Sequence, residues 1–81
     1  MSNIEGFILS NKFRKAVFLE ISSGENSLER IAKKHHLLPQ MVKKVAQEMV
    51  DKGLIKEKDG AFELTEKGEK IFGKLKGSNA I

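Results

Sequence analysis

The chain has 81 residues, 40% of them hydrophobic and 32% charged, a composition typical of one small folded domain spanning residues 1–81. The absence of cysteine excludes disulfides, thiolate metal sites and a cysteine nucleophile. The sequence shows neither a signal-peptide pattern nor an apolar stretch of transmembrane length, so we expect a cytoplasmic protein without a membrane partner.

Positive charge is concentrated in one third of the chain. The whole sequence carries a net charge of +4, from 15 basic and 11 acidic residues. Between Arg30 and Lys58, eight basic residues stand against three acidic ones, so this segment alone carries +5. Charge focused on one contiguous segment favours a polyanionic partner such as nucleic acid.

Two helices are predicted in the first half of the chain. The apolar segment Ile4–Leu9 is too short to assign. Ser10 can cap a helix from about Asn11 to Ile21, in which apolar residues recur at helical spacing: Phe13, Ala16, Val17 and Ile21. After the turn-forming run SSGEN, a second helix starts after Asn26 or Ser27, either of which can cap it, and ends near His35. Glu29 stands three residues after Asn26, as in a capping box, and the buried stripe is Leu28, Ile31 and Ala32.

The third helix has the clearest pattern. Pro39 fits its first turn, where the missing N–H costs nothing, and Gly53 is placed to end it in a left-handed conformation. Apolar residues follow the spacing of one buried helix face: Val42, Val45, Ala46, Met49 and Val50. The opposite face carries a polar stripe: Gln40, Lys43, Lys44 and Gln47.

A β-hairpin and a last helix complete the chain. Asp59-Gly60 predicts a two-residue turn between two short strands, pairing Lys58 with Ala61 and, in register, Ile55 with Leu64. Alternation then separates an apolar side (Ile55, Phe62, Leu64) from a mostly basic side (Lys56, Lys58, Glu63). Thr65 can cap a helix from Glu66 to about Leu75, and residues 77–81 are predicted to be a frayed tail.

The stretch SLERIAKKHHLLPQMVKKVAQEMVDKGLIKEKDGAFELTEKG resembles the winged helix-turn-helix family, in the group of small prokaryotic and archaeal transcription regulators that includes MarR-like and ArsR-like proteins. This resemblance implies a mainly α fold with a small β-hairpin wing (α+β), built as a three-helix core plus a C-terminal helix. It implies sequence-specific binding to double-stranded DNA, with a recognition helix at residues 39–52 in the major groove. The wing, residues 54–64, would lie beside the DNA backbone or in the minor groove.

The resemblance also assigns candidate DNA-binding residues. Those on the recognition helix are Gln40, Met41, Lys43, Lys44 and Gln47, those on the wing are Lys56 and Lys58, and those supporting phosphate contacts are Lys33 and Lys34, beside Arg30. Each has a plainer interpretation. The stripe can be an ordinary solvated face, Met41 the border of the core, and the wing lysines a protection of the strand edge.

Two residues depart from the family pattern. The position of His36 is commonly glycine in the family, which implies a positive φ in the turn, and that of Leu38 is commonly Ser or Thr, which caps the recognition helix. Leucine has no acceptor, so this cap is lost. Adjacent histidines such as His35 and His36 point in different directions and cannot both reach one metal ion. We therefore expect no metal site and no cofactor.

The apolar terminal segments leave two possibilities open. These segments either cover one another within a chain or form a homodimer, and their apolar residues are Phe7, Ile8, Leu9, Ile71, Phe72 and Leu75. We expect the homodimer, because this is more apolar surface than a three-helix core needs. The residues show no catalytic arrangement, so we expect a non-enzymatic protein. A ligand-sensing repressor is a third possibility, although no polar-lined pocket can be inferred and a small-molecule effector stays unknown. The alternative function is a winged helix used as a protein-protein interaction module in a transcription or repair assembly, for which Lys43 and Lys44 would be unusual.

Overall fold

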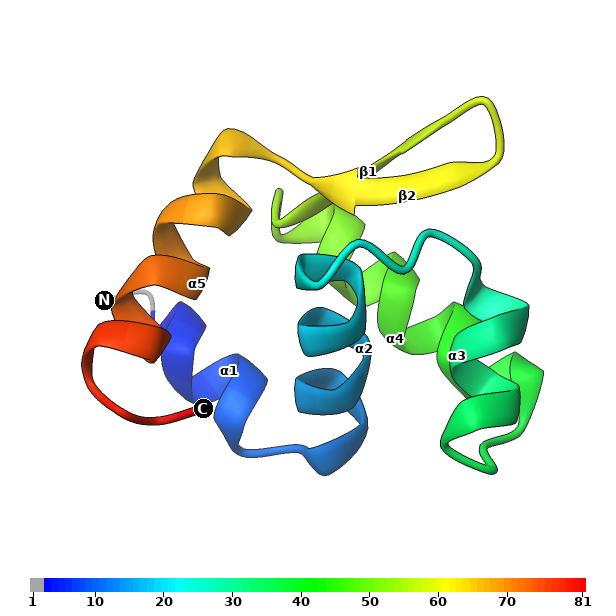
Figure 1. The fold of residues 1–81 in the computed structure, drawn as a ribbon, viewed down its shortest axis with the longest axis horizontal. Coiled ribbons are helices and arrows are strands. Elements are labelled where there is room, and N and C mark those ends of the chain that lie inside the picture. Colours follow the sequence, from blue (N-terminus) through cyan, green and yellow to red (C-terminus); the bar gives the residue numbers. More distant parts are fainter. Residues whose placement is uncertain (1–2) are drawn as a thin grey trace.

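A computed structural model describes residues 3–81. Its elements, in chain order, are α1 (Ile4–Leu9), α2 (Lys12–Ser22), α3 (Leu28–Lys34), α4 (Pro39–Asp51), β1 (Ile55–Lys58), β2 (Ala61–Leu64) and α5 (Glu66–Gly77). In Figure 1, α2 stands at the centre, with α3 and α4 on one side of it and α1 and α5 on the other. The hairpin lies across one end of the helices. This confirms the predicted mainly helical α+β fold with a β-hairpin wing.

The core forms where α2 and α4 face each other. From α4 it takes the side chains predicted from helical spacing, namely Val42, Val45, Ala46 and Met49. From α2 it takes Val17, Phe18 and Ile21, and α3 adds Ile31 and Ala32. The aromatic ring of Phe18 is fully buried. Spacing alone missed this residue, because it lies at the edge of the predicted apolar stripe.

The terminal helices cover each other within one chain. The short apolar segment before α2 forms the helix α1, whose Ile8 is fully buried. Ile71 and Leu75 of α5 join the same core, and the ring of Phe72 meets that of Phe18 edge-on at 6.4 Å between centroids. Much of the apolar surface from which a homodimer was predicted is therefore used inside the monomer.

The first residue of α2 and that of α3 are each set by a preceding side chain that accepts hydrogen bonds from the free backbone amides. Asn11, not Ser10, caps α2, because its side chain accepts from the amides of Phe13 and Arg14 while Ser10 closes α1. Ser27, one of the two predicted caps, caps α3 by accepting from the backbone amide of Arg30. The other prediction, a capping box of Asn26 with Glu29, is wrong, since the backbone N–H of Asn26 donates to the Glu25 carboxylate.

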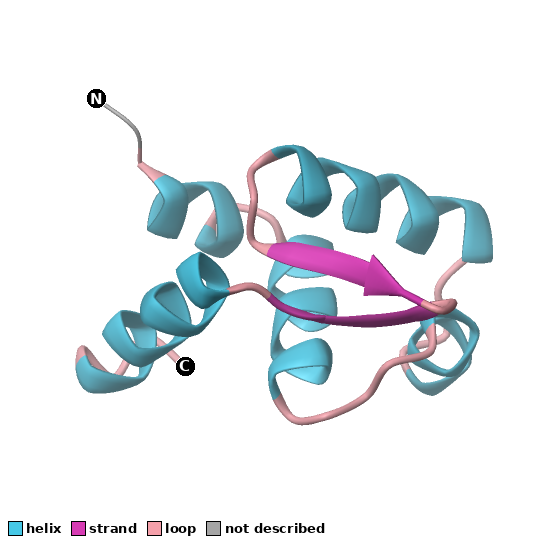
Figure 2. Cartoon of the chain, turned by 90° about the horizontal axis from the view of Figure 1, so that it is seen from above, coloured by secondary structure: helices cyan, strands magenta, loops and turns pink. Residues whose placement is uncertain are grey.

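The hairpin has the predicted register, from Lys58 opposite Ala61 to Ile55 opposite Leu64. Its turn residues have φ values of 53° at Asp59 and 82° at Gly60, as a two-residue turn of this type requires. The Phe62 amide donates to the Asn26 carbonyl at 3.1 Å, which ties β2 to the loop between α2 and α3. Seen from above in Figure 2, the hairpin lies over α2 and alongside α4.

The last helix is anchored at both ends. Thr65 caps it, and a Cβ at Gly68 would collide with the Leu54 carbonyl oxygen, so α5 starts in close contact with the base of the wing. The helix continues to Gly77, beyond the predicted end near Leu75. Residues 77–81, predicted as a frayed tail, instead form a C-terminal cap, in which the Ala80 amide donates to the Leu75 carbonyl at 2.9 Å.

The turn between α3 and α4 is a left-handed helix cap centred on His36. The φ of His36 is 55°, which confirms the positive value implied by the family pattern. The Leu37 amide donates to the Ala32 carbonyl at 2.8 Å, as expected of such a cap. Gly53, with a φ of 76°, forms a left-handed cap of the same kind at the end of α4.

Replacing His36 with glycine should stabilise the fold. Glycine adopts a positive φ without the steric cost of a Cβ, and this gain exceeds the extra entropy of the unfolded chain. We expect His36→Gly to raise the free energy of unfolding by about 0.3–1 kcal/mol in urea titrations. His36→Ala, which keeps the Cβ, is the control and should give no gain. A destabilised glycine variant would show that the histidine side chain itself holds the turn.

Candidate nucleic-acid interface

The outward side of α4 is a polar surface. The apolar residues of α4 recur at helical spacing on one side of the helix, and this side is buried. The polar residues between them lie on the opposite side, which faces solvent. Four predicted contact residues are exposed there, and we call them the polar face of α4: Gln40, Lys43, Lys44 and Gln47. The structure thus brings together the amino-terminal stripe that the sequence predicted.

Met41 lies at the border of this face. It is half-buried and lines an open hollow with Leu38 and with Phe13 of α2. At the other end of the face, the Gln47 side-chain amide donates to the Asp51 carboxylate at 2.9 Å. Asp51, in the last turn of α4, is therefore hydrogen-bonded within its own helix.

Arg14 of α2 fixes α4 in place through a contact that sequence reasoning missed. Its guanidinium donates from two nitrogens to the two carboxylate oxygens of Glu48, each at 3.2 Å. A third nitrogen donates to the Phe7 carbonyl at 3.2 Å, and the guanidinium carbon lies 4.1 Å from the centroid of the Phe7 ring. The hydrogen bonds from Arg14 lower the pKa of the Glu48 carboxyl. One side chain thereby joins α1, α2 and α4 and neutralises an acid beside the polar face.

The two candidate lysines of α3 are exposed, and they differ in their surroundings. Lys34 forms an ion pair with Glu20 of α2, at 3.1 Å between Nζ and Oε2. The same carboxylate lies 2.7 Å from Nε2 of His35. The hydrogen bond with His35 and, after it, that with Lys34 lower the pKa of Glu20. Lys33 extends into solvent from the last turn of α3, so the two lysines lie on α3 and outside the polar face of α4.

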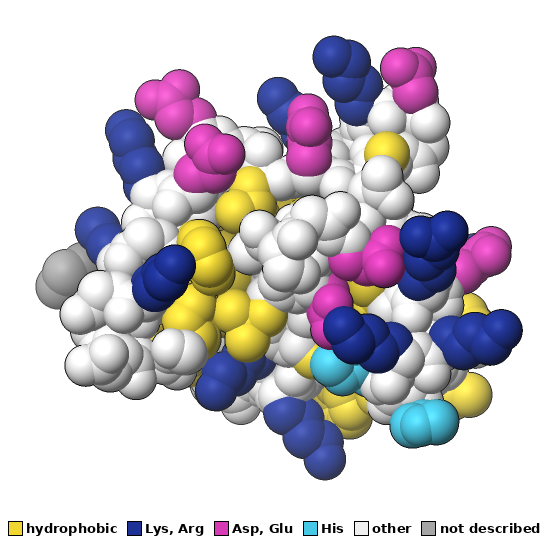
Figure 3. Space-filling view, in the orientation of Figure 1, with side chains coloured by type: hydrophobic (Ala, Val, Ile, Leu, Met, Phe, Trp, Pro, Cys, Tyr) yellow, Lys and Arg dark blue, Asp and Glu magenta, His cyan; other side chains and the backbone are white. Residues whose placement is uncertain are grey.

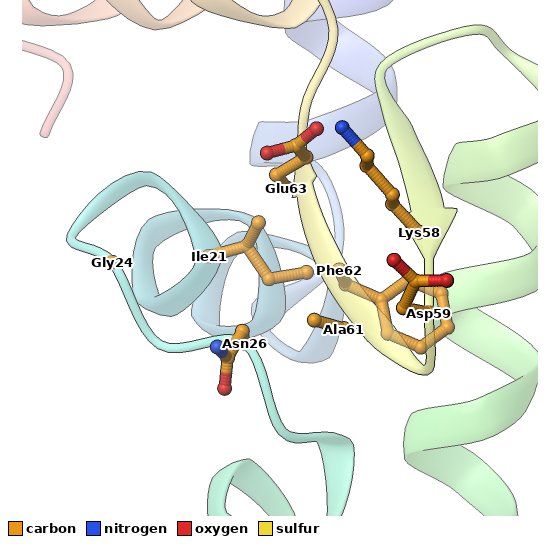
Figure 4. A pocket seen from close by; sticks show the side chains of 8 residues that line it. All are labelled: Ile21, Gly24, Asn26, Lys58, Asp59, Ala61, Phe62 and Glu63. Carbon is orange, nitrogen blue, oxygen red and sulfur yellow. The ribbon is translucent and has the colours of Figure 1, made fainter.

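The wing lysines share a side of the hairpin with an acid. Lys56 and Lys58 are exposed, and Lys56 Nζ lies 3.6 Å from a carboxylate oxygen of Glu63 on the opposite strand. In Figure 4 the ammonium end of Lys58 is directed toward the same carboxylate. Glu63 therefore reduces the net positive charge of this side of the wing.

The other side of the hairpin borders α4. Glu57 and Phe62 line a shallow hollow together with Lys43 and Gln47 of the polar face. The strand pairing places Lys56 and Lys58 on the opposite side of the hairpin from Glu57 and Phe62. The structure therefore keeps the wing lysines and the polar face of α4 as two separate basic surfaces.

The histidines lie at the α3–α4 turn, and both are visible on the surface in Figure 3. His35 is bound to Glu20, whereas His36 is exposed. Within residues 3–81 there is no group of three or more His, Asp or Glu side chains arranged to hold a metal ion.

A family model described as winged helix-turn-helix matches residues 15–81, which cover α3, α4, the hairpin, α5 and most of α2. A search of curated proteins found no match. In the part of the chain that the structure describes, no helix has both the length and the apolar character needed to cross a membrane.

The Arg14–Glu48 pair should make the stability of the fold depend on pH. The native pKa of Glu48 lies below its ordinary value of 4.5, so the stabilisation is present above that value and is lost as the pH falls through the native pKa. Because the pair is partly exposed to solvent, we expect Glu48→Gln to cost about 0.5–1 kcal/mol at neutral pH.

Urea titrations of Glu48→Gln and the parent protein at several pH values measure this cost. The difference in unfolding free energy should shrink toward zero at the acid end of the series. Glu57→Gln, a change on β1 at an exposed carboxylate outside any helix, is the matched control and should have little effect at any pH. A cost of Glu48→Gln that stayed constant down to low pH would contradict the role of the charge.

Proposed function

The chain belongs to the winged helix-turn-helix family, and on this basis we propose that it binds double-stranded DNA sequence-specifically as a transcription regulator. The observation that carries the proposal is the polar face of α4, with exposed lysines at 43 and 44 and exposed amides at 40 and 47. In the family, the recognition helix at this place in the fold lies in the major groove.

The residue types of this face suit base recognition. Lysine donates to the O6 and N7 acceptors of guanine, and glutamine can pair with the N6 and N7 edge of adenine. The positive end of the helix dipole at Pro39 adds a favourable field for a nearby phosphate. The acids Glu48 and Asp51 lie in the second half of α4, away from its amino-terminal end, and the Arg14 guanidinium neutralises Glu48.

The remaining basic residues are placed where they can contact the DNA phosphates. Lys33 on α3 and Lys56 and Lys58 on the wing lie outside the polar face, where they can neutralise phosphates without reading bases. Neutralisation of phosphates releases counterions from DNA, so these residues would supply affinity that depends on salt and not on sequence.

The competing function is a protein-protein interaction module in a transcription or repair assembly. Such a module would present apolar or acidic residues where this chain has Lys43 and Lys44. The exposed basic character of α4 therefore favours DNA, and we infer a binding protein without catalytic activity.

We propose a homodimer as the DNA-binding form. Figure 3 shows hydrophobic side chains gathered between α2 and α5, and Leu19, Phe72 and Ile81 line an apolar hollow there. Figures 1 and 2 together place α4 on the far side of the molecule from this patch. A second copy seated on the patch would leave the polar face of α4 accessible, and a two-fold pair would match a palindromic site.

The two basic surfaces should respond differently to substitution. Lys58→Ala should weaken binding to preferred and random duplexes alike and lower the slope of log affinity against log salt by about 1. Loss of Lys43 or Lys44 should cost about 1–3 kcal/mol on the preferred sequence and much less on random DNA, if that lysine reads a guanine. Gln47→Ala should show the same signature more weakly.

The measurement is the affinity of each variant for both duplexes across a salt series, after selection of the preferred sequence from randomised DNA. Lys70→Ala, on the exposed side of α5, is the matched control for loss of one positive charge. If a variant with alanine at both Lys43 and Lys44 bound both duplexes as tightly as the parent protein, the hypothesis that α4 reads bases would be ruled out. The protein-interaction module would then be the better account.

The homodimer is tested by sedimentation. We expect the protein to sediment as a dimer at tens of micromolar, and Leu19→Glu to convert it to a folded monomer, because a carboxylate in the apolar patch would be buried unpaired. Leu38→Glu, a change on α4 outside the patch, should leave the dimer intact. A monomeric parent protein at this concentration would rule the dimer out.

A further inference from the structure

Leu38, at the start of α4, is an apolar side chain in an unusual place. It is 68% exposed, and the other large hydrophobic residue exposed within residues 3–81 is Leu9, at 38%. It occupies the N-cap position of α4, where a leucine cannot accept a hydrogen bond from the helix amides. The residue therefore serves neither the core nor the cap.

A single exposed leucine is common on protein surfaces, and Leu38 is distinguished by the residues that surround it. Leu38 shares an open hollow with Gln40, Met41 and Lys44 of α4 and with Phe13 of α2. Two of these, Gln40 and Lys44, belong to the polar face of α4. Leu38 and Met41 thus form an apolar edge along the amino-terminal end of the surface that we propose enters the major groove.

The major groove contains one apolar group, the 5-methyl of thymine. The side chains of Leu38 and Met41 have no N–H or O–H donor for a phosphate or a base edge, and burial against a methyl group is the favourable contact open to them. We propose that Leu38, together with Met41, is a specificity-determining contact that selects thymine by its 5-methyl group. This inference rests on the proposed DNA binding.

The test removes the methyl group and nothing else. In the preferred duplex, each thymine is replaced in turn by 2′-deoxyuridine, which keeps the base-pairing edge. At one or two positions we expect the affinity of the parent protein to fall about fourfold for each methyl lost. Leu38→Ala should bind the thymine and deoxyuridine duplexes equally at the position that Leu38 contacts. Met41→Ala should do so at the same position or the adjacent one.

A matched variant separates this contact from a general loss of apolar surface. Leu9→Ala removes the other exposed leucine, which lies on α1, and should keep the full preference for thymine. Because the Leu38 side chain is largely exposed, Leu38→Ala should melt like the parent protein, as circular dichroism can verify.

The outcomes distinguish this inference from the function on which it depends. Failure of the parent protein to bind any duplex would overturn the DNA-binding proposal and this one with it. Tight, sequence-specific binding that is indifferent to deoxyuridine at every position would overturn the methyl contact alone. A Leu38→Ala variant that retained the full thymine preference would also overturn it, because the methyl would then be read by another residue.

Discussion

The burial of one side of α4 is the constraint on which the rest of the structure depends. Val42, Val45 and Met49 are almost fully enclosed, and burial of each such side chain contributes about 1.5–3 kcal/mol. Because the net stability of a domain is only roughly 5–15 kcal/mol, exposing these side chains would remove a large part of it. Any rotation of α4 about its axis would expose these side chains. The core therefore fixes which residues of α4 face outward.

The ends of α4 are set by conformation and charge. A left-handed residue precedes it at His36 and another follows it at Gly53, so the chain turns sharply at both ends of the helix. Between these turns, Arg14 binds Glu48 and so connects α4 to α2. The cap that leucine at position 38 cannot supply is partly offset by Pro39, whose fixed φ suits the first turn. Both the turns at its ends and its contact with α2 therefore position the helix.

Local sequence patterns predicted most of the fold, but they did not predict the contacts between residues far apart in the sequence. The extent of α4, the hairpin register and the positive φ at 36 follow from spacing, turn residues and the family pattern. The Arg14–Glu48 pair joins residues 34 positions apart, and no periodicity signals such a contact. The same limit applies to the candidate site. Helical spacing placed the polar face of α4, but only the packed hairpin shows that Glu57, and not Lys56 or Lys58, borders it.

Contact of the polar face of α4 with DNA is the central claim, and an NMR titration tests it most directly. Isotope-labelled protein would be titrated with a short duplex while the backbone amide signals are followed. The account predicts that the largest shifts occur at Gln40, Lys43, Lys44 and Gln47, with smaller ones at the wing lysines. Shifts confined to the α2–α5 patch, or no shifts at low salt, would contradict it.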